Sequence, residues 1–213
     1  ICSLVSGESD YMMADPVVYV VDDDLIVRIL LEKVFQAANI NVETYASAED
    51  FLATYSPNNS GCLLLDIMMP GMSGLELQEV LVSLRNNTPV IFLTGSDEVK
   101  VAVKALKAGA VDFIEKPVVP KTVLKCVNRA MELDLKNRYE RLQAEHIEQR
   151  MTALSPRERE VMKWIIRGKS NKIIARIMGI SIRTVEVHRR NVIVKMDANS
   201  VVDLVQMVFR IQK

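Results

Sequence analysis

Short apolar runs alternate with segments of helical periodicity between residues 16 and 118, and this alternation limits the fold more than any other feature of the chain. The runs have the length and β-branched composition of buried strands, and the segments between them carry apolar residues on one helical face. Strands joined by helices pair in parallel, because a parallel crossover needs about a dozen residues. The pattern therefore predicts an α/β domain with a doubly wound, five-stranded parallel sheet.

The expected strands and helices alternate along the chain. Strands are predicted at residues 17–21, 42–45, 62–65, 90–93 and 111–114. Helices are predicted between them at residues 25–38, 48–54, 75–84 and 99–108. Asp24 and Ser47 precede two of these helices and are expected to cap them, since a short polar side chain accepts a hydrogen bond from the free amides of the first turn.

The chain changes character after residue 119, where strand-like runs stop and helical periodicity continues. We expect an N-terminal tail at 1–15, the α/β domain at 16–122, a linker helix at 123–150 and a small all-helical domain at 151–213. The apolar spacing of the linker fits either a partly coiled-coil spacer or a solvated helix, and the sequence leaves both open.

Polar side chains stand at the carboxyl ends of the predicted strands. Asp22 and Asp23 follow the first strand, Asp66 the third, Thr94 the fourth and Lys116 the fifth. In a parallel sheet the carboxyl ends meet at one edge, where ligands bind. The sequence therefore predicts that these five side chains converge.

Converging carboxylates repel unless a cation lies among them. Mg²⁺ binds through one or two carboxylates, with a carbonyl oxygen and several waters completing its shell. We predict a Mg²⁺ or Mn²⁺ site built from Asp22 or Asp23, together with Asp66 and the backbone carbonyl of Met68.

An aspartate beside such an ion can attack a phosphorus centre. The metal reduces the negative charge on donor and nucleophile, and a nearby ammonium and hydroxyl bind the phosphoryl oxygens. Asp66 is the expected nucleophile, with Lys116 and Thr94 as its partners. Each of these residues alone is more often structural, but the whole set favours phosphoryl transfer.

The same residues resemble the receiver domain of two-component response regulators. The resemblance covers residues 16–122 and rests on a DD pair after the first strand, an Asp followed by MMPGMSG, a Thr after the fourth strand and KP after the fifth. It implies a flavodoxin/CheY-like fold. It also implies that Asp66 accepts a phosphoryl group from the phosphohistidine of a sensor histidine kinase, with Mg²⁺ as the cofactor.

The resemblance further implies a switch pair, Thr94 and Phe113, and a cis bond at Lys116-Pro117. Gly95 stands where receiver domains often have Ala or Ser. This difference affects the expected rigidity of the loop and leaves the expected chemistry unchanged. Phosphorylation is then expected to favour a receiver homodimer.

The C-terminal part is basic, in contrast to the acidic N-terminal part. Residues 151–213 hold 13 basic and 5 acidic side chains, a surplus that suits phosphate binding. Ala175, Gly179 and Val185 have the spacing of a helix-turn-helix, in which a small residue, a turn glycine and an apolar residue let two helices pack. The expected inner face consists of Ile174, Ile180, Ile182, Val185, Val192 and Met196.

The strings LSPREREV, GKSNKIIA and SIRTVEVHRRNVIVKM resemble the LuxR-type output domain, and its pairing with a receiver is typical of the FixJ/NarL class. The resemblance implies that the helix from Ser181 to Met196 enters the major groove of double-stranded promoter DNA. Ile173 departs from the Glu that this family usually has. The expected DNA-binding residues are Glu186, Val187 and Arg190 at base edges, Lys172, Thr184, His188 and Arg189 at the backbone, and Arg183 on the same outward face.

We therefore expect a DNA-binding transcriptional regulator and not an enzyme. Its expected partners are a sensor histidine kinase, promoter DNA and a second copy of the chain, with RNA polymerase as a further candidate. Apolar stretches fall short of the roughly 20 residues that cross a bilayer, and the three cysteines lack metal or disulfide spacing, so we expect a soluble cytoplasmic protein.

Two alternatives remain. One is a LuxR-type transcription factor that works without phosphorylation. The other is a phosphatase of the haloacid dehalogenase type with Asp66 as its nucleophile, although that chemistry normally uses a second Asp two positions later, where this chain has Met68.

Overall fold

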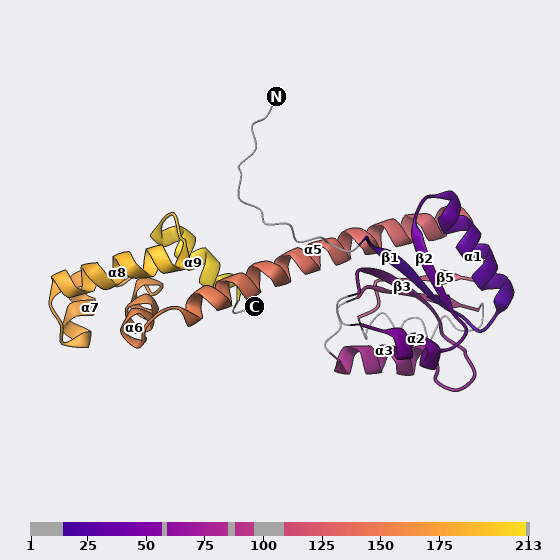
Figure 1. Ribbon diagram of the computed structural model, residues 1–213, viewed down its shortest axis with the longest axis horizontal. Coiled ribbons are helices and arrows are strands. Elements are labelled where there is room, and N and C mark those ends of the chain that lie inside the picture. Colours follow the sequence, from indigo (N-terminus) through magenta and orange to yellow (C-terminus); the bar gives the residue numbers. More distant parts are fainter. Residues whose placement is uncertain (1–14, 57–58, 85–87, 96–108, 212–213) are drawn as a thin grey trace, which may run out of the picture. The chain divides into compact units, whose positions relative to one another are not determined.

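The chain forms two compact units, Ile1–Asn137 and Arg138–Lys213, in the computed structural model (Figure 1). The structure describes residues 15–56, 59–84, 88–95 and 109–211. The predicted helix at 99–108 lies outside the described residues. The predicted division at residues 122 and 150 stays a prediction, and the long linker helix contributes side chains to both units.

The first unit is a five-stranded parallel sheet in the order β2-β1-β3-β4-β5. Its strands are β1 (Val17–Val21), β2 (Asn41–Tyr45), β3 (Gly61–Asp66), β4 (Val90–Thr94) and β5 (Asp112–Glu115). Its helices are α1 (Leu25–Ala37), α2 (Ala48–Thr54), α3 (Gly74–Ser83) and the first part of α5 (Pro120–Thr152). The predicted α/β fold is confirmed, with strand and helix ends differing by a residue or two.

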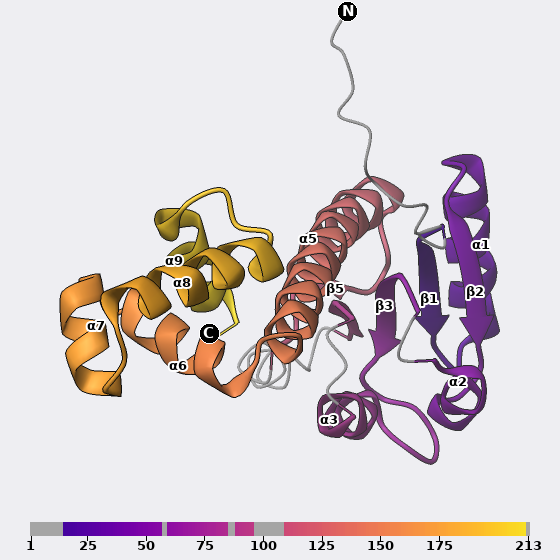
Figure 2. The same cartoon turned by 60° about the vertical axis from the view of Figure 1, so that its left-hand side comes forward.

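Helices cover both faces of the sheet, α1 and α5 on one and α2 and α3 on the other, as Figure 2 shows from a second direction. Successive residues of β1 point to opposite faces, so Val18 and Val20 pack with Leu31 of α1 while Tyr19 and Val21 pack with Phe51 of α2. This explains why β1 is apolar throughout. A strand buried on both faces cannot alternate apolar and polar residues.

A buried aspartate ties α5 to the start of β3. Asp134 is 5% exposed, and its Oδ2 accepts a hydrogen bond from the Gly61 amide at 2.9 Å and from the Ser60 hydroxyl at 3.3 Å. Gly61 has a φ of 122°, and a Cβ there would lie 1.9 Å from the Val17 carbonyl oxygen. The close approach of β1 and β3 at this point therefore requires glycine.

The second unit contains α6 (Pro156–Ile165), α7 (Asn171–Met178), α8 (Ile182–Met196) and α9 (Val201–Arg210). The helix α8 matches the one expected from Ser181 to Met196, and α6 and α7 lie in the segment expected to be helical. The helix α9 was expected only as part of a generally helical segment, because no start signal was assigned to Ser200, which caps it by accepting from the Asp203 amide.

The core of the second unit lies between α8, its neighbouring helices and the end of α5. Val185, Val192 and Met196 are fully buried, as predicted, and Ile147 of α5 belongs to the same cluster. The prediction that Ile182 joins this inner face is wrong, since its side chain is 46% exposed. Residue 182 lies about 60° round the helix axis from residue 185, which places it beside the buried stripe.

An ion pair joins the first and third helices of this unit. Glu158 completes a capping box with Ser155 at the start of α6, and its Oε2 lies 2.7 Å from Lys195 Nζ of α8. The hydrogen bonds from Lys195 and from the Ser155 amide lower the pKa of Glu158 to about 2. This carboxylate therefore stays ionised at neutral pH and fixes α8 against α6.

The role of Asp134 predicts the effect of its removal. Asp134→Ala should lower the free energy of unfolding of the first unit by about 1–3 kcal/mol, because the buried Gly61 amide loses its acceptor. Asp134→Asn keeps an acceptor oxygen and should cost less. Urea unfolding followed by circular dichroism measures the difference.

The fluorescence of Trp164, the single tryptophan of the chain, gives an internal control, since it lies in the second unit and should report an unchanged midpoint there. Equal losses in both Asp134 variants would contradict the proposed hydrogen bond.

Candidate functional sites

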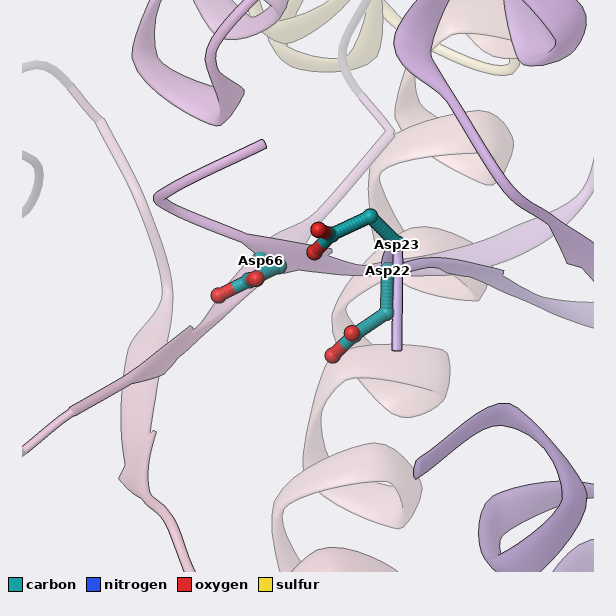
Figure 3. Close-up of side chains that lie close together, drawn as sticks. All are labelled: Asp22, Asp23 and Asp66. Atoms are coloured by element: carbon teal, nitrogen blue, oxygen red, sulfur yellow. The ribbon is translucent and has the colours of Figure 1, made fainter. Parts of the chain in front are cut away.

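Three aspartates gather at the carboxyl edge of the sheet. Asp22 and Asp23 follow β1, and Asp66 ends the neighbouring strand β3. Each offers a carboxylate oxygen, and these oxygens all lie within 4.8 Å of one another (Figure 3). The predicted convergence is confirmed for these three carboxylates, and it follows from parallel pairing, because the chain leaves adjacent strands at the same edge.

Lys116 brings a positive charge to this cluster. Its Nζ lies 2.8 Å from Asp22 Oδ2 and 3.1 Å from Asp66 Oδ2. Burial alone would lower the pKa of Lys116, but the hydrogen bonds and charges of Asp22 and Asp66 raise it. The lysine therefore stays protonated and offsets part of the repulsion between the carboxylates. The cis bond expected at Lys116-Pro117 is present.

The three consecutive aspartates have different surroundings. Asp22 is fully buried, and its Oδ1 accepts from the Asp24 amide at 2.9 Å while its Oδ2 pairs with Lys116. Asp24 caps α1 through the Ile26 amide at 2.8 Å, as predicted. Asp23 is exposed. Of the pair that the sequence left open, Asp23 is thus the residue that is accessible to solvent.

Asp66 holds its negative charge at a cost. Burial and the neighbouring Asp22 raise its pKa to about 6, although Lys116 acts in the opposite direction. Its strand also leads directly into a tightly closed loop, because the Gly74 amide donates to the Ile67 carbonyl at 3.0 Å and a Cβ on Gly74 would lie 2.1 Å from the Asp66 carbonyl oxygen. The backbone after the aspartate is therefore fixed.

The loop after Asp66 directs Met68 outward. Ile67 and Met69 are buried in the sheet core, whereas Met68 between them is 64% exposed. The tip of the loop is held from α2, where Glu49 Oε1 accepts from the Met72 amide at 3.1 Å. Sequence reasoning missed Glu49, because no local pattern indicates a contact with a backbone amide 23 residues away. The predicted role of the Met68 carbonyl stays a prediction.

The two residues of the expected switch pair lie on neighbouring strands. Thr94 ends β4 and is 1% exposed, and its hydroxyl donates to the Gly95 carbonyl at 3.0 Å. Phe113 of β5 stands in register with Phe92 of β4 and is 37% exposed. Thr94 therefore reaches the same edge as the carboxylates, while Phe113 remains partly in solvent.

A second candidate site lies on α7 and α8. Gly179 ends α7 with a φ of 66°, and Ser181 caps α8 by accepting from the Thr184 amide at 3.0 Å. This is the predicted helix-turn-helix. With Val185, Val192 and Met196 in the core, the exposed residues of α7 and α8 include Lys172, Arg183, Thr184, Glu186, Val187 and Arg190.

His188 and Arg189 differ from the others by being half-buried. The Nδ1 atom of His188 is enclosed and has no hydrogen-bond partner within the described part of the chain. The expected DNA contacts of all eight residues stay predictions.

Each of the two sites lies in a segment that matches a known protein family. Residues 18–128 match the family model described as the response regulator receiver domain, and residues 152–208 match bacterial regulatory proteins of the LuxR family. The chain is a response regulator of the FixJ/NarL class. It joins a receiver domain to a LuxR-type DNA-binding domain, as the sequence motifs indicate.

Similar proteins match nearly the whole length of this chain. The regulator is 43% identical over 195 residues to the transcriptional regulatory protein FixJ of Rhizobium meliloti (strain 1021), covering 92% of this chain and 96% of that one. It is 38% identical over 196 residues to the response regulator protein TodT of Pseudomonas putida, covering 92% and 86%.

Solved structures agree with the fold. The structure of the response regulator StyR matches with a TM-score of 0.81 and 39% identity, covering 92% of this chain and all of that one. The crystal structure of FixJ-N matches with a TM-score of 0.52 and 43% identity, covering 55% of this chain and 94% of that one. Among the described residues, no helix of the regulator is long and apolar enough to cross a membrane.

The raised pKa of Asp66 predicts how stability depends on pH without metal. The folded protein binds this proton more tightly than the unfolded chain, whose carboxyl has its ordinary value near 3.8. Its contribution is therefore complete below that value and is lost as the pH rises through about 6. Between about pH 5 and pH 8 the receiver should lose stability in EDTA.

Asp66→Asn should flatten this dependence, and Mg²⁺ should restore stability to the wild type at the higher pH. Urea unfolding at both pH values measures it. An equally steep decline in Asp66→Asn would assign the dependence to other groups.

Proposed function

We propose that the regulator is switched by phosphorylation of Asp66. The observation that carries this proposal is the position of the Asp66 carboxylate, 3.1 Å from Lys116 and within 4.8 Å of the Asp22 and Asp23 oxygens. A carboxylate so placed can act as a nucleophile toward phosphorus, with an ammonium ready to bind a phosphoryl oxygen. The donor class is a phosphohistidine on a sensor histidine kinase.

The transfer balances as a single displacement. An Asp66 oxygen forms a bond to phosphorus while the bond from phosphorus to the imidazole nitrogen of the donor breaks. The electron pair of that bond leaves with the kinase histidine, which takes up a proton from solvent, and Asp66 becomes an acyl phosphate. The regulator is thus a phosphoacceptor, and it consumes one donor for each activation.

The carboxylate oxygens of this cluster fit Mg²⁺ or Mn²⁺, because they are hard ligands and the cluster carries more negative than positive charge. Asp23, Asp66 and the Met68 carbonyl would hold the ion, and Asp22 would orient its waters. The ion would neutralise charge between the incoming phosphoryl group and Asp66.

Thr94 and Phe113 are the proposed relay. The Thr94 hydroxyl, now bonded to the Gly95 carbonyl, would turn to the phosphoryl group, and the space so vacated would accept the partly exposed ring of Phe113. This shifts a population between two states by no more than their difference in affinity for the phosphoryl group. The altered surface around β5 would then favour a homodimer that presents two DNA-binding domains to half-sites.

Labelling with a small acyl phosphate and Mg²⁺ tests the phosphoacceptor. Wild type should gain one phosphoryl group, and Asp66→Asn should gain none because its amide is not a nucleophile. Asp24→Asn is the matched control, since asparagine also caps helices and the neighbouring site stays intact. Intact-mass measurement and peptide mapping give the result.

Label on a residue other than Asp66, or its persistence in Asp66→Asn, would remove the proposal. Sedimentation of labelled and unlabelled protein tests the homodimer separately. A regulator that binds its operator equally well in both states would instead work without phosphorylation.

The DNA-binding residues predict two kinds of loss. Arg190→Ala should lower the binding free energy by about 1–3 kcal/mol on an operator obtained by DNA selection and by little on scrambled DNA. The reason is that an exposed arginine at a base edge reads sequence. Arg189→Ala should weaken both by similar amounts and reduce the salt slope by about 1, as expected for a phosphate contact.

Fluorescence anisotropy over a range of salt concentrations measures both variants. Identical losses on operator and scrambled DNA for Arg190→Ala would exclude base readout by this residue.

A further inference from the structure

Arg28 of α1 reaches back to the carboxylate cluster, although no sequence pattern marked it as a site residue. Its Nη1 donates to the backbone carbonyl of Asp22 at 2.6 Å, and the contact is partly buried. Arg28 lies one helical turn beyond Asp24, where its own amide makes the first helical bond of α1 to the Asp24 carbonyl at 3.1 Å. Its side chain thus folds over the turn that joins β1 to α1.

This contact completes the fixation of Asp22. The Asp22 amide donates to the Tyr45 carbonyl of β2 at 3.2 Å, and its two carboxylate oxygens are held by the Asp24 amide and by Lys116. The remaining polar atom is the backbone carbonyl, which Arg28 holds. Four separate partners therefore fix this one residue.

The carbonyl that Arg28 binds belongs to the peptide group between Asp22 and Asp23. A peptide group is planar, so fixing its oxygen also fixes the direction in which the chain enters Asp23. Asp23 is the exposed member of the cluster and has no strand to orient it. The direction of its carboxylate toward Asp66 depends on that peptide plane.

We propose that Arg28 is a positioning residue for the cation and phosphoryl site, acting by holding the peptide between Asp22 and Asp23 so that the Asp23 carboxylate faces Asp66. The proposal rests on the function proposed above and adds to it a residue outside the carboxylate, threonine and lysine set. Groups that orient metal ligands in this way commonly change metal affinity by about 10–100-fold when removed.

Position and charge make opposite predictions here. A guanidinium near a cation site repels the cation, so its removal should strengthen Mg²⁺ binding if charge alone matters. Its removal should weaken Mg²⁺ binding if Arg28 acts by orienting Asp23. A fall or a rise in Mg²⁺ affinity therefore distinguishes the two roles. If Arg28 only stabilised the fold, the folded variant would bind Mg²⁺ with the wild-type affinity.

Calorimetric titration of the full chain with MgCl₂ alone tests the proposal. Arg28→Ala should bind Mg²⁺ about tenfold more weakly than wild type. Lys33→Ala is the matched control, because it removes one positive charge from an exposed position of the same helix, and its affinity should stay at the wild-type value. Arg28→Lys, which keeps the charge and a donor, should be intermediate.

Unchanged or tighter Mg²⁺ binding by Arg28→Ala would overturn the proposal. If that variant does not fold, Arg28→Lys decides: weaker binding with an unchanged circular dichroism spectrum supports positioning, and wild-type affinity overturns it. The rate of labelling by the acyl phosphate should fall in step with Mg²⁺ affinity. Wild type that neither binds Mg²⁺ nor accepts label would instead contradict the proposed function, so the two failures are distinguishable.

Discussion

The ammonium group of Lys116 allows two buried carboxylates to lie together at the carboxyl edge of this sheet. Lys116 contacts carboxylates that follow two different strands, at 2.8 Å for Asp22 and 3.1 Å for Asp66. Buried charges are tolerated only when they are paired, and a single cation shared by two acids leaves the cluster with an excess of negative charge. That excess adds to burial in raising the pKa of Asp66 to about 6, and it is the charge that the proposed divalent cation would offset.

The receiver divides its three consecutive aspartates between structure and chemistry. Asp24 caps α1, and Asp22 is buried with each of its polar atoms engaged. Asp23 is left exposed beside Asp66. Fixed neighbours around two acids thus leave a third open to solvent, an arrangement that would let a cation bind without a change in the shape of the site.

The DNA-binding domain relies on a different kind of constraint. Its helix α8 is fixed by a buried apolar stripe and by the ion pair of Lys195 with Glu158, whose pKa near 2 keeps the pair charged. The two domains have separate cores, and α5 supplies side chains to both, Val123 and Val127 to the first and Ile147 to the second. Changes in either core therefore act on the same helix.

Local patterns in the sequence determined the order of strands and helices, most capping residues and the set of polar side chains at the strand ends, because periodicity and capping depend on neighbours within a few residues. Ile182 was misplaced, since its apolar character does not reveal which side of α8 is covered. The contacts of Arg28, Glu49 and Asp134, and the different surroundings of Asp22 and Asp23, were decided only by the tertiary structure. Each of these depends on where a group of another segment lies in the folded chain. The type of a side chain does not predict that position.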